Sequence, residues 1–150
     1  MQTLAQPRTI SCYDEDWVLW IDAQIRLLSE KRFSELDIAN LVEELDSMKN
    51  KELRTLKNRL RVLIMHLLKC EFQKSHPQNK WHSTLIEQRE RIKDVLQDSP
   101  SLRRKLDEFI RSTYSYARKM AAHETLMPLS SFPPENPYTV KQILDHDFIP

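Results

Sequence analysis

The chain has 150 residues, of which 40% are hydrophobic and 30% charged, and its formal net charge is +1. This length and composition predict one globular domain with a single core, and the near-zero charge argues against a dedicated nucleic-acid-binding protein. The absence of glycine makes glycine-rich phosphate loops and hairpins with primed turns improbable, and it favours helices.

Cysteine usage and hydropathy together predict a cytoplasmic protein. Cys12 and Cys70 are far apart and have no metal-ligand spacing, which favours a reducing compartment. No apolar run reaches the roughly 18 residues needed to span a bilayer, and residues 1–16 lack the pattern of a signal peptide. We therefore expect no membrane association, no metal site and no cofactor.

Apolar spacing is helical through most of the chain. Residues 1–12 are expected to be flexible, and a first helix is predicted to follow Asp14 as its N-cap. A second helix is predicted to begin after Asp37. If it ran without interruption, Lys49 would lie at the centre of its apolar stripe, so we expect a kink or short break near Ser47–Asn50.

Two further helices are predicted before a change in composition. The second helix ends before Pro77, and the third carries apolar residues at helical spacing from Trp81 to Leu96. A fourth helix is expected to begin at Ser99 and Pro100, a cap residue followed by a proline in the first turn.

The last part of the chain, residues 127–150, contains five prolines. It is predicted to form an extended strap on the helices, closed by a short helix with a capping box between Thr139 and Gln142. The predicted fold class is therefore all-α: a four-to-five-helix bundle with a C-terminal proline-rich strap and a short terminal helix, in a single domain over residues 1–150.

Charge is unevenly distributed along the chain. Residues 14–46 hold ten acids against three bases, whereas residues 49–74 hold eight bases against two acids. This asymmetry is consistent with complementary helices and a favourable helix dipole, or with a basic face that binds phosphate.

Six sequence blocks occur in the order and at the spacing of a known family: YDEDWVLW, LDIANLVEELDSM, MHLLKCEFQ, WHSTLIEQRERI, DSPSLR and PLSSFPPENPYTVKQILDHDFIP. From about Tyr13 to the C-terminus the chain resembles the domain-of-unknown-function-29 family. It departs from the family pattern at Met48–Lys49 (usually with a glycine), Cys70 (usually aromatic) and Asn136 (usually cysteine). The resemblance implies an all-helical bacterial protein with a single domain, and it implies no activity.

A line of polar residues marks the candidate site. Glu52, Arg59, His66 and Gln73 repeat every seven residues and share one side of the predicted helix, at the shoulder of its apolar stripe. On the third helix Arg89 also falls on the apolar face. Helical periodicity likewise directs Glu124 of the fourth helix inward.

Two interpretations of these residues remain open. The first is a buried network, in which Arg89 pairs with Glu44, Glu52 or Glu124, because a charge is not buried alone. The second is a metal-independent ribonuclease or a toxin–antitoxin component. At the motif level only, Arg59 and His66 resemble the Arg and His of the HEPN superfamily.

In the ribonuclease interpretation, His66 and Arg59 are the catalytic residues, with His66 as the acid–base group. Phosphate or partner binding is assigned to Lys69, Gln73, Arg89 and Glu52, and RNA is the expected substrate. The leading hypothesis is instead a small cytoplasmic helical protein that binds a protein partner or forms a homodimer.

Overall fold

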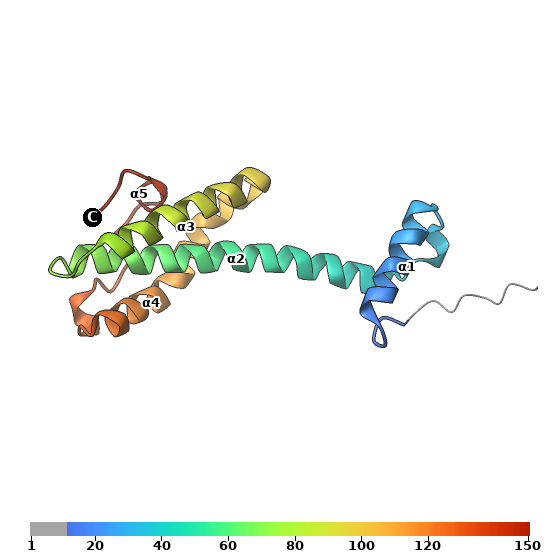
Figure 1. Ribbon diagram of the computed structural model, residues 1–150, viewed down its shortest axis with the longest axis horizontal. Helices are drawn as coiled ribbons and strands as arrows, with labels where there is room; N and C mark the ends of the chain where they lie inside the picture. The colour runs from blue at the N-terminus through green and yellow to red at the C-terminus, as the bar shows by residue number, and fades with distance from the viewer. Residues whose placement is uncertain (1–11) are drawn as a thin grey trace, which may run out of the picture. The chain divides into compact units, whose positions relative to one another are not determined.

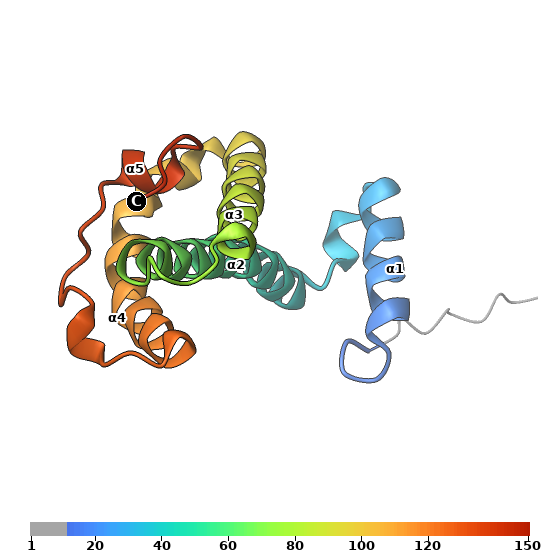
Figure 2. The same cartoon turned by 60° about the vertical axis from the view of Figure 1, so that its left-hand side comes forward.

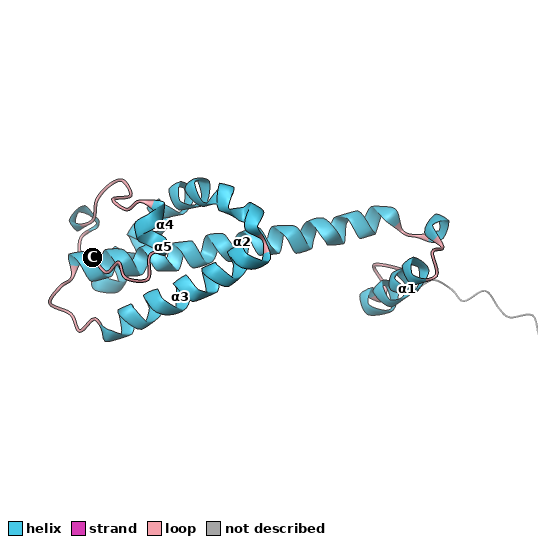
Figure 3. Ribbon diagram, turned by 90° about the horizontal axis from the view of Figure 1, so that it is seen from above, coloured by secondary structure: helices cyan, strands magenta, loops and turns pink. Residues whose placement is uncertain are grey.

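The computed structural model describes residues 12–150, and every regular element among them is a helix (Figures 1 and 3). The elements are α1 (Trp17–Ser29), η1 (Phe33–Glu35), α2 (Ile38–Phe72), α3 (Asn79–Asp98), η2 (Pro100–Lys105), α4 (Leu106–Thr125), η3 (Leu129–Ser131) and α5 (Val140–Leu144), the η elements being 3-10 turns. The all-α prediction is confirmed. The flexible segment predicted for residues 1–12 lies, apart from Cys12, outside the described residues.

The chain divides into two compact units, Met1–Lys49 and Asn50–Pro150. In the first unit, Asp16 caps α1 by accepting a hydrogen bond from the Leu19 amide at 3.0 Å. The prediction of Asp14 as the cap was therefore wrong. A cap side chain reaches the amide three residues later, and α1 begins at Trp17.

Asp37 links the buried side of α1 to the start of α2 by hydrogen bonds. The Asp37 carboxylate accepts from the Trp20 indole at 3.0 Å and from the Asn40 amide at 3.4 Å, as expected of the N-cap predicted there. Its own amide donates to the Gln24 side chain at 2.9 Å. Polar and aromatic contacts therefore position these two helices with few buried aliphatic residues.

The helix α2 runs without interruption from Ile38 to Phe72, so the break predicted near Ser47–Asn50 was wrong. The prediction assumed that the apolar stripe is buried along its whole length. Around Lys49 it is not, and the Lys49 ammonium lies on the exposed surface 2.6 Å from the Asp46 carboxylate. A lysine in an exposed stripe carries no desolvation cost, so nothing forces the helix to break.

Residues 50–72 of α2 form the centre of the second unit, and α3 and α4 lie along two of its sides (Figure 2). Side chains at helical spacing from Leu56 to Leu68 are fully buried in one hydrophobic cluster with Leu85 and Ile92 of α3 and Ile110 of α4. Helical periodicity therefore locates this core correctly.

The segment between α3 and α4 differs slightly from the prediction. Pro100 begins a 3-10 turn, η2, and the Ser99 side chain makes no capping hydrogen bond. The α-helix itself begins at Leu106.

Residues 127–150 pack on the second unit through a few buried side chains and backbone carbonyls. Phe132, Tyr138 and Ile143 belong to the core cluster. Arg118 of α4 donates to the Phe132 carbonyl at 2.9 and 3.1 Å. The predicted capping box of Thr139 is confirmed, and it starts α5.

Within residues 12–150, two helix ends are followed by a left-handed residue although the chain has no glycine. Lys31 follows α1 with φ of 58°, and Leu126 ends α4 with φ of 57°. At both positions the chain reverses with a side chain present, a conformation that costs roughly 1–2 kcal/mol per residue.

Candidate functional site

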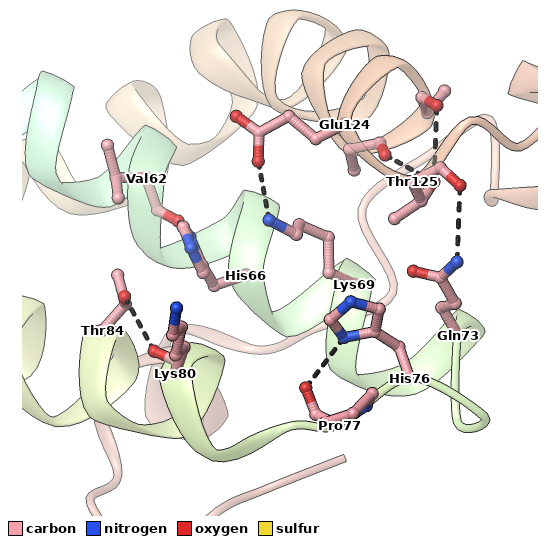
Figure 4. A network of polar contacts seen from close by, with 12 residues as sticks. Val62, His66, Lys69, Gln73, His76, Pro77, Lys80, Thr84, Glu124 and Thr125 are labelled. Atoms are coloured by element: carbon pink, nitrogen blue, oxygen red, sulfur yellow. Dashed lines mark hydrogen bonds and ion pairs between the residues drawn. The ribbon is translucent and has the colours of Figure 1, made fainter.

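An ion pair between α2 and α4 forms the centre of the candidate site. The Lys69 ammonium lies 2.6 Å from a carboxylate oxygen of Glu124, as Figure 4 shows. The Lys69 side chain is 7% exposed and the Glu124 side chain 36%. The indole of Trp81, on α3, lies 4.8 Å from the same ammonium and adds a cation–π contact. Lys69 is thus held by three helices.

His66 lies one turn before Lys69 on α2. Its Nδ1 is 2.9 Å from the Val62 carbonyl oxygen. A carbonyl only accepts, so Nδ1 carries the proton and Nε2 is the basic nitrogen. Burial lowers the pKa of His66, and the nearby Lys69 charge lowers it further, while the Val62 carbonyl and Glu124 oppose the shift. The side chain is therefore neutral at pH 7.

The lowered pKa of His66 predicts a pH dependence of stability. The unfolded chain binds a proton near pH 6.5, whereas the folded chain binds it at a lower pH, so the free energy of unfolding falls as pH decreases below 6.5. Replacing His66 with glutamine is expected to flatten this fall. Urea titrations at pH 7.5 and 5.5 would measure it. His123→Gln, at an exposed histidine of α4, is the control, and equal pH dependence of the two variants would contradict the prediction.

Two more side chains extend the cluster toward the turn after α2 (Figure 4). Gln73 donates to the Thr125 carbonyl at 3.3 Å, which supplies a partner to one of the last carbonyls of α4. The His76 ring stacks on Trp81 with centroids 4.4 Å apart. An aromatic layer therefore separates this end of Lys69 from solvent.

Arg59 and Glu52 lie further back on α2 and do not join this cluster. Arg59 lines a pocket of about 270 Å³ with Thr55, Asn58, Val62 and Gln88. Its Nε atom is buried and has no acceptor among the described residues. No hydrogen bond or ion pair within residues 12–150 joins Arg59 or Glu52 to His66. The four-residue line predicted from the sequence thus separates into different surroundings.

Arg89 is buried on α3, yet the predicted pairing with a glutamate was wrong. Its Nε donates to the Ile143 carbonyl at 2.9 Å and its Nη2 to the Gln142 carbonyl at 3.2 Å. These carbonyls lie in the last turn of α5, where intrahelical donors are missing. Glu124 pairs with Lys69 instead, and Glu44 accepts from Tyr13 and Trp17.

Comparison with known proteins identifies the family. A model of the family described as "Domain of unknown function DUF29" matches residues 12–149. The chain belongs to the DUF29 family. Searches of curated proteins and of solved structures found no match to it. The resemblance found in the sequence blocks is thereby confirmed.

Sequence reasoning missed two contacts of this DUF29 chain. The first is the pairing of Lys69, predicted to bind phosphate or a partner, with Glu124. The second is the hydrogen bond that the Glu71 carboxylate accepts from the Tyr138 hydroxyl. Burial raises the pKa of Tyr138, and the hydrogen bond to Glu71 raises it further. A helical register could direct Glu124 inward, but no sequence signal connects Glu71 with a tyrosine 67 residues later.

Within residues 12–150, no three His, Cys, Asp or Glu side chains gather as a possible metal site. No helix in the same range is both long and apolar enough to cross a bilayer.

Proposed function

We propose that this DUF29 protein acts by self-association, as a protein-interaction module whose contact surface lies on the Met1–Lys49 unit. The observation that carries the proposal is a row of four exposed apolar residues on α2, here called the α2 stripe. The row consists of Ile38, Val42, Leu45 and Met48, which are 57, 56, 63 and 66% exposed.

The spacing of the α2 stripe supports a helical partner. Its residues follow one another at intervals of four and three, which places them on one side of the helix. Exposed apolar side chains that adjoin one another mark interaction surfaces more often than isolated ones do. On α1, Trp17, Ile25 and Leu28 are also 46–55% exposed. The unit therefore offers more apolar surface than one exposed residue would.

Charge around the α2 stripe favours a second copy of this chain as the partner. Asp37 directly precedes the stripe and Lys49 directly follows it. If two copies pair with their α2 helices antiparallel and their stripes in register, Asp37 of each copy lies beside Lys49 of the other. Parallel pairing would place like charges together, which is destabilising. An antiparallel two-fold dimer is thus the self-complementary arrangement.

The contacts of Lys69 weigh against the alternative ribonuclease hypothesis. A phosphate-binding lysine needs an accessible ammonium, whereas the Lys69 side chain is 7% exposed and already pairs with Glu124. Arg59, the second residue of the proposed catalytic pair, lines a pocket that does not include His66.

The free thiols of Cys12 and Cys70 support the proposed cytoplasmic location, because the cytoplasm is reducing.

The test measures the molar mass of the full chain in solution by light scattering after size exclusion. Wild-type protein is expected to elute at twice the mass of one chain, and Leu45→Glu as a monomer, because the new carboxylate would be buried in an apolar contact. Leu45 is exposed, so the variant should fold normally.

Ser47→Glu is the matched control, since two helical positions lie about 200° apart and Ser47 faces away from Leu45. It should retain the dimer. A monomeric wild type at tens of micromolar, or equal masses for the two variants, would refute self-association through the α2 stripe.

A further inference from the structure

A second pocket lies in the Asn50–Pro150 unit, away from the Lys69 cluster. Its volume is about 160 Å³, and its lining comes from α3, η2 and the C-terminal segment. It is lined by Arg89, Ile92, Lys93, Leu96, Arg103, Leu144 and His146. We call it the α3 pocket. Four of its seven lining residues are basic or can be protonated, and none is acidic.

Arg89 forms the buried part of the α3 pocket. The residue is only 2% exposed, and its Nε and Nη2 are engaged by carbonyls of α5. The remaining nitrogen, Nη1, has no acceptor among residues 12–150. Nη1 is not fully enclosed by protein atoms. Arg89 has no carboxylate in hydrogen-bond contact, and burial lowers the pKa of its guanidinium. A buried cation without an anion is costly and favours an anionic ligand.

The groups around Arg89 leave positive charge in the pocket. At the edge of the pocket, the Glu90 carboxylate lies 3.8 Å from the Lys93 ammonium and 3.3 Å from the His146 ring. Glu90 is therefore the acidic partner of both of these residues. Asp145 attracts Arg89 from a greater distance without bonding to it. Arg103 makes no ion pair with another described residue. The guanidinium groups of Arg89 and Arg103 thus both lack a bonded carboxylate.

The rest of the lining is apolar. Ile92 and Leu96 of α3 lie one turn apart, and Leu144 adds a third aliphatic side chain. A volume of about 160 Å³ equals that of about five water molecules in the liquid, at about 30 Å³ each, so the pocket suits a small ligand. We propose that the α3 pocket binds a small aliphatic carboxylate, with its carboxylate between Arg89 and Arg103 and its chain against these aliphatic residues.

The proposal is tested by calorimetric titration of the full chain with 3-methylbutanoate, acetate and inorganic phosphate. Saturable binding is expected for 3-methylbutanoate, with weaker binding of acetate, since acetate lacks the branched chain. Arg103→Gln should weaken binding of 3-methylbutanoate roughly tenfold by removing a bidentate donor. Arg89 is left intact, because it also holds α5.

Arg104→Gln is the matched control, since Arg104 is adjacent in η2 and exposed but does not line the pocket. It should bind 3-methylbutanoate as the wild type does. Arg103→Lys, which keeps the positive charge but loses the bidentate donor, provides a second weakened variant should Arg103→Gln melt early in circular dichroism. Absence of binding to the wild type, or equal affinity of the Arg103 and Arg104 variants, would overturn the site. Preference for phosphate would overturn its assignment to aliphatic carboxylates.

Discussion

Replacing Arg89 with methionine is expected to lower the free energy of unfolding by about 1–3 kcal/mol. Methionine fills much of the volume of the arginine stem but donates no hydrogen bond, so the carbonyls of Ile143 and Gln142 lose their partner. The loss is reduced because the buried guanidinium no longer has to be desolvated. Amide exchange should rise in α5, since Arg89 links this helix to α3.

Urea unfolding and hydrogen exchange of the full chain measure the two effects. Arg91→Met is the control on the same helix, because Arg91 is half-exposed and pairs only with Glu87 at the surface. It should change stability by less than about 0.5 kcal/mol. Equal exchange in α5 for both variants would show that Arg89 does not hold the C-terminal segment.

Breaking the pair of Lys69 and Glu124 from its two ends is expected to give unequal results. Glu124→Gln leaves a buried ammonium without its anion, and we expect a loss of about 1–2 kcal/mol, less than for a fully buried pair because Glu124 is partly exposed. Lys69→Met leaves a carboxylate that can turn toward water, and a methionine sulfur still packs well against Trp81. This variant should be close to the wild type in stability.

Thermal and urea unfolding at pH 7 compare the two variants. Asp46→Asn, which removes the anion of the exposed pair with Lys49, is the control and should cost less than about 0.5 kcal/mol. If Lys69→Met proves the more damaging change, the ammonium stabilises the fold through contacts other than Glu124.

The parts of the fold that depend on local chemistry could be predicted from the sequence. The apolar period from Trp81 to Leu96 identified α3, and the Thr139–Gln142 spacing identified the start of α5. The break in α2 was wrongly predicted because an apolar stripe in a sequence does not reveal whether a partner covers it. Between Ile38 and Met48 these residues are exposed in the single chain. Asp14 was predicted as the cap of α1, but the Leu19 amide donates to the carboxylate of Asp16, two residues later.

The candidate site was predicted less completely because its partners come from distant segments. Helical period correctly directed Arg89 and Glu124 toward other helices, but it did not specify what they meet. The acceptors of Arg89 are backbone carbonyls, which every residue has and no side-chain pattern marks. The line through His66 is regular on α2, yet Arg59 lines a pocket with Gln88 of α3 and Gln73 bonds to Thr125 of α4. Lying on one side of the helix therefore did not bring these residues into one site.

The left-handed residues Lys31 and Leu126 have a consequence for the unfolded protein. An average chain of this length would contain about ten glycines, each of which enlarges the set of backbone conformations that folding must abandon. Where a native conformation tolerates another residue, avoiding glycine stabilises by roughly 0.4–1 kcal/mol per position, through the unfolded state alone. The conformational cost at Lys31 and Leu126 is smaller than the stabilisation summed over about ten such positions. A restricted unfolded ensemble therefore contributes to the stability of this helical protein alongside its core.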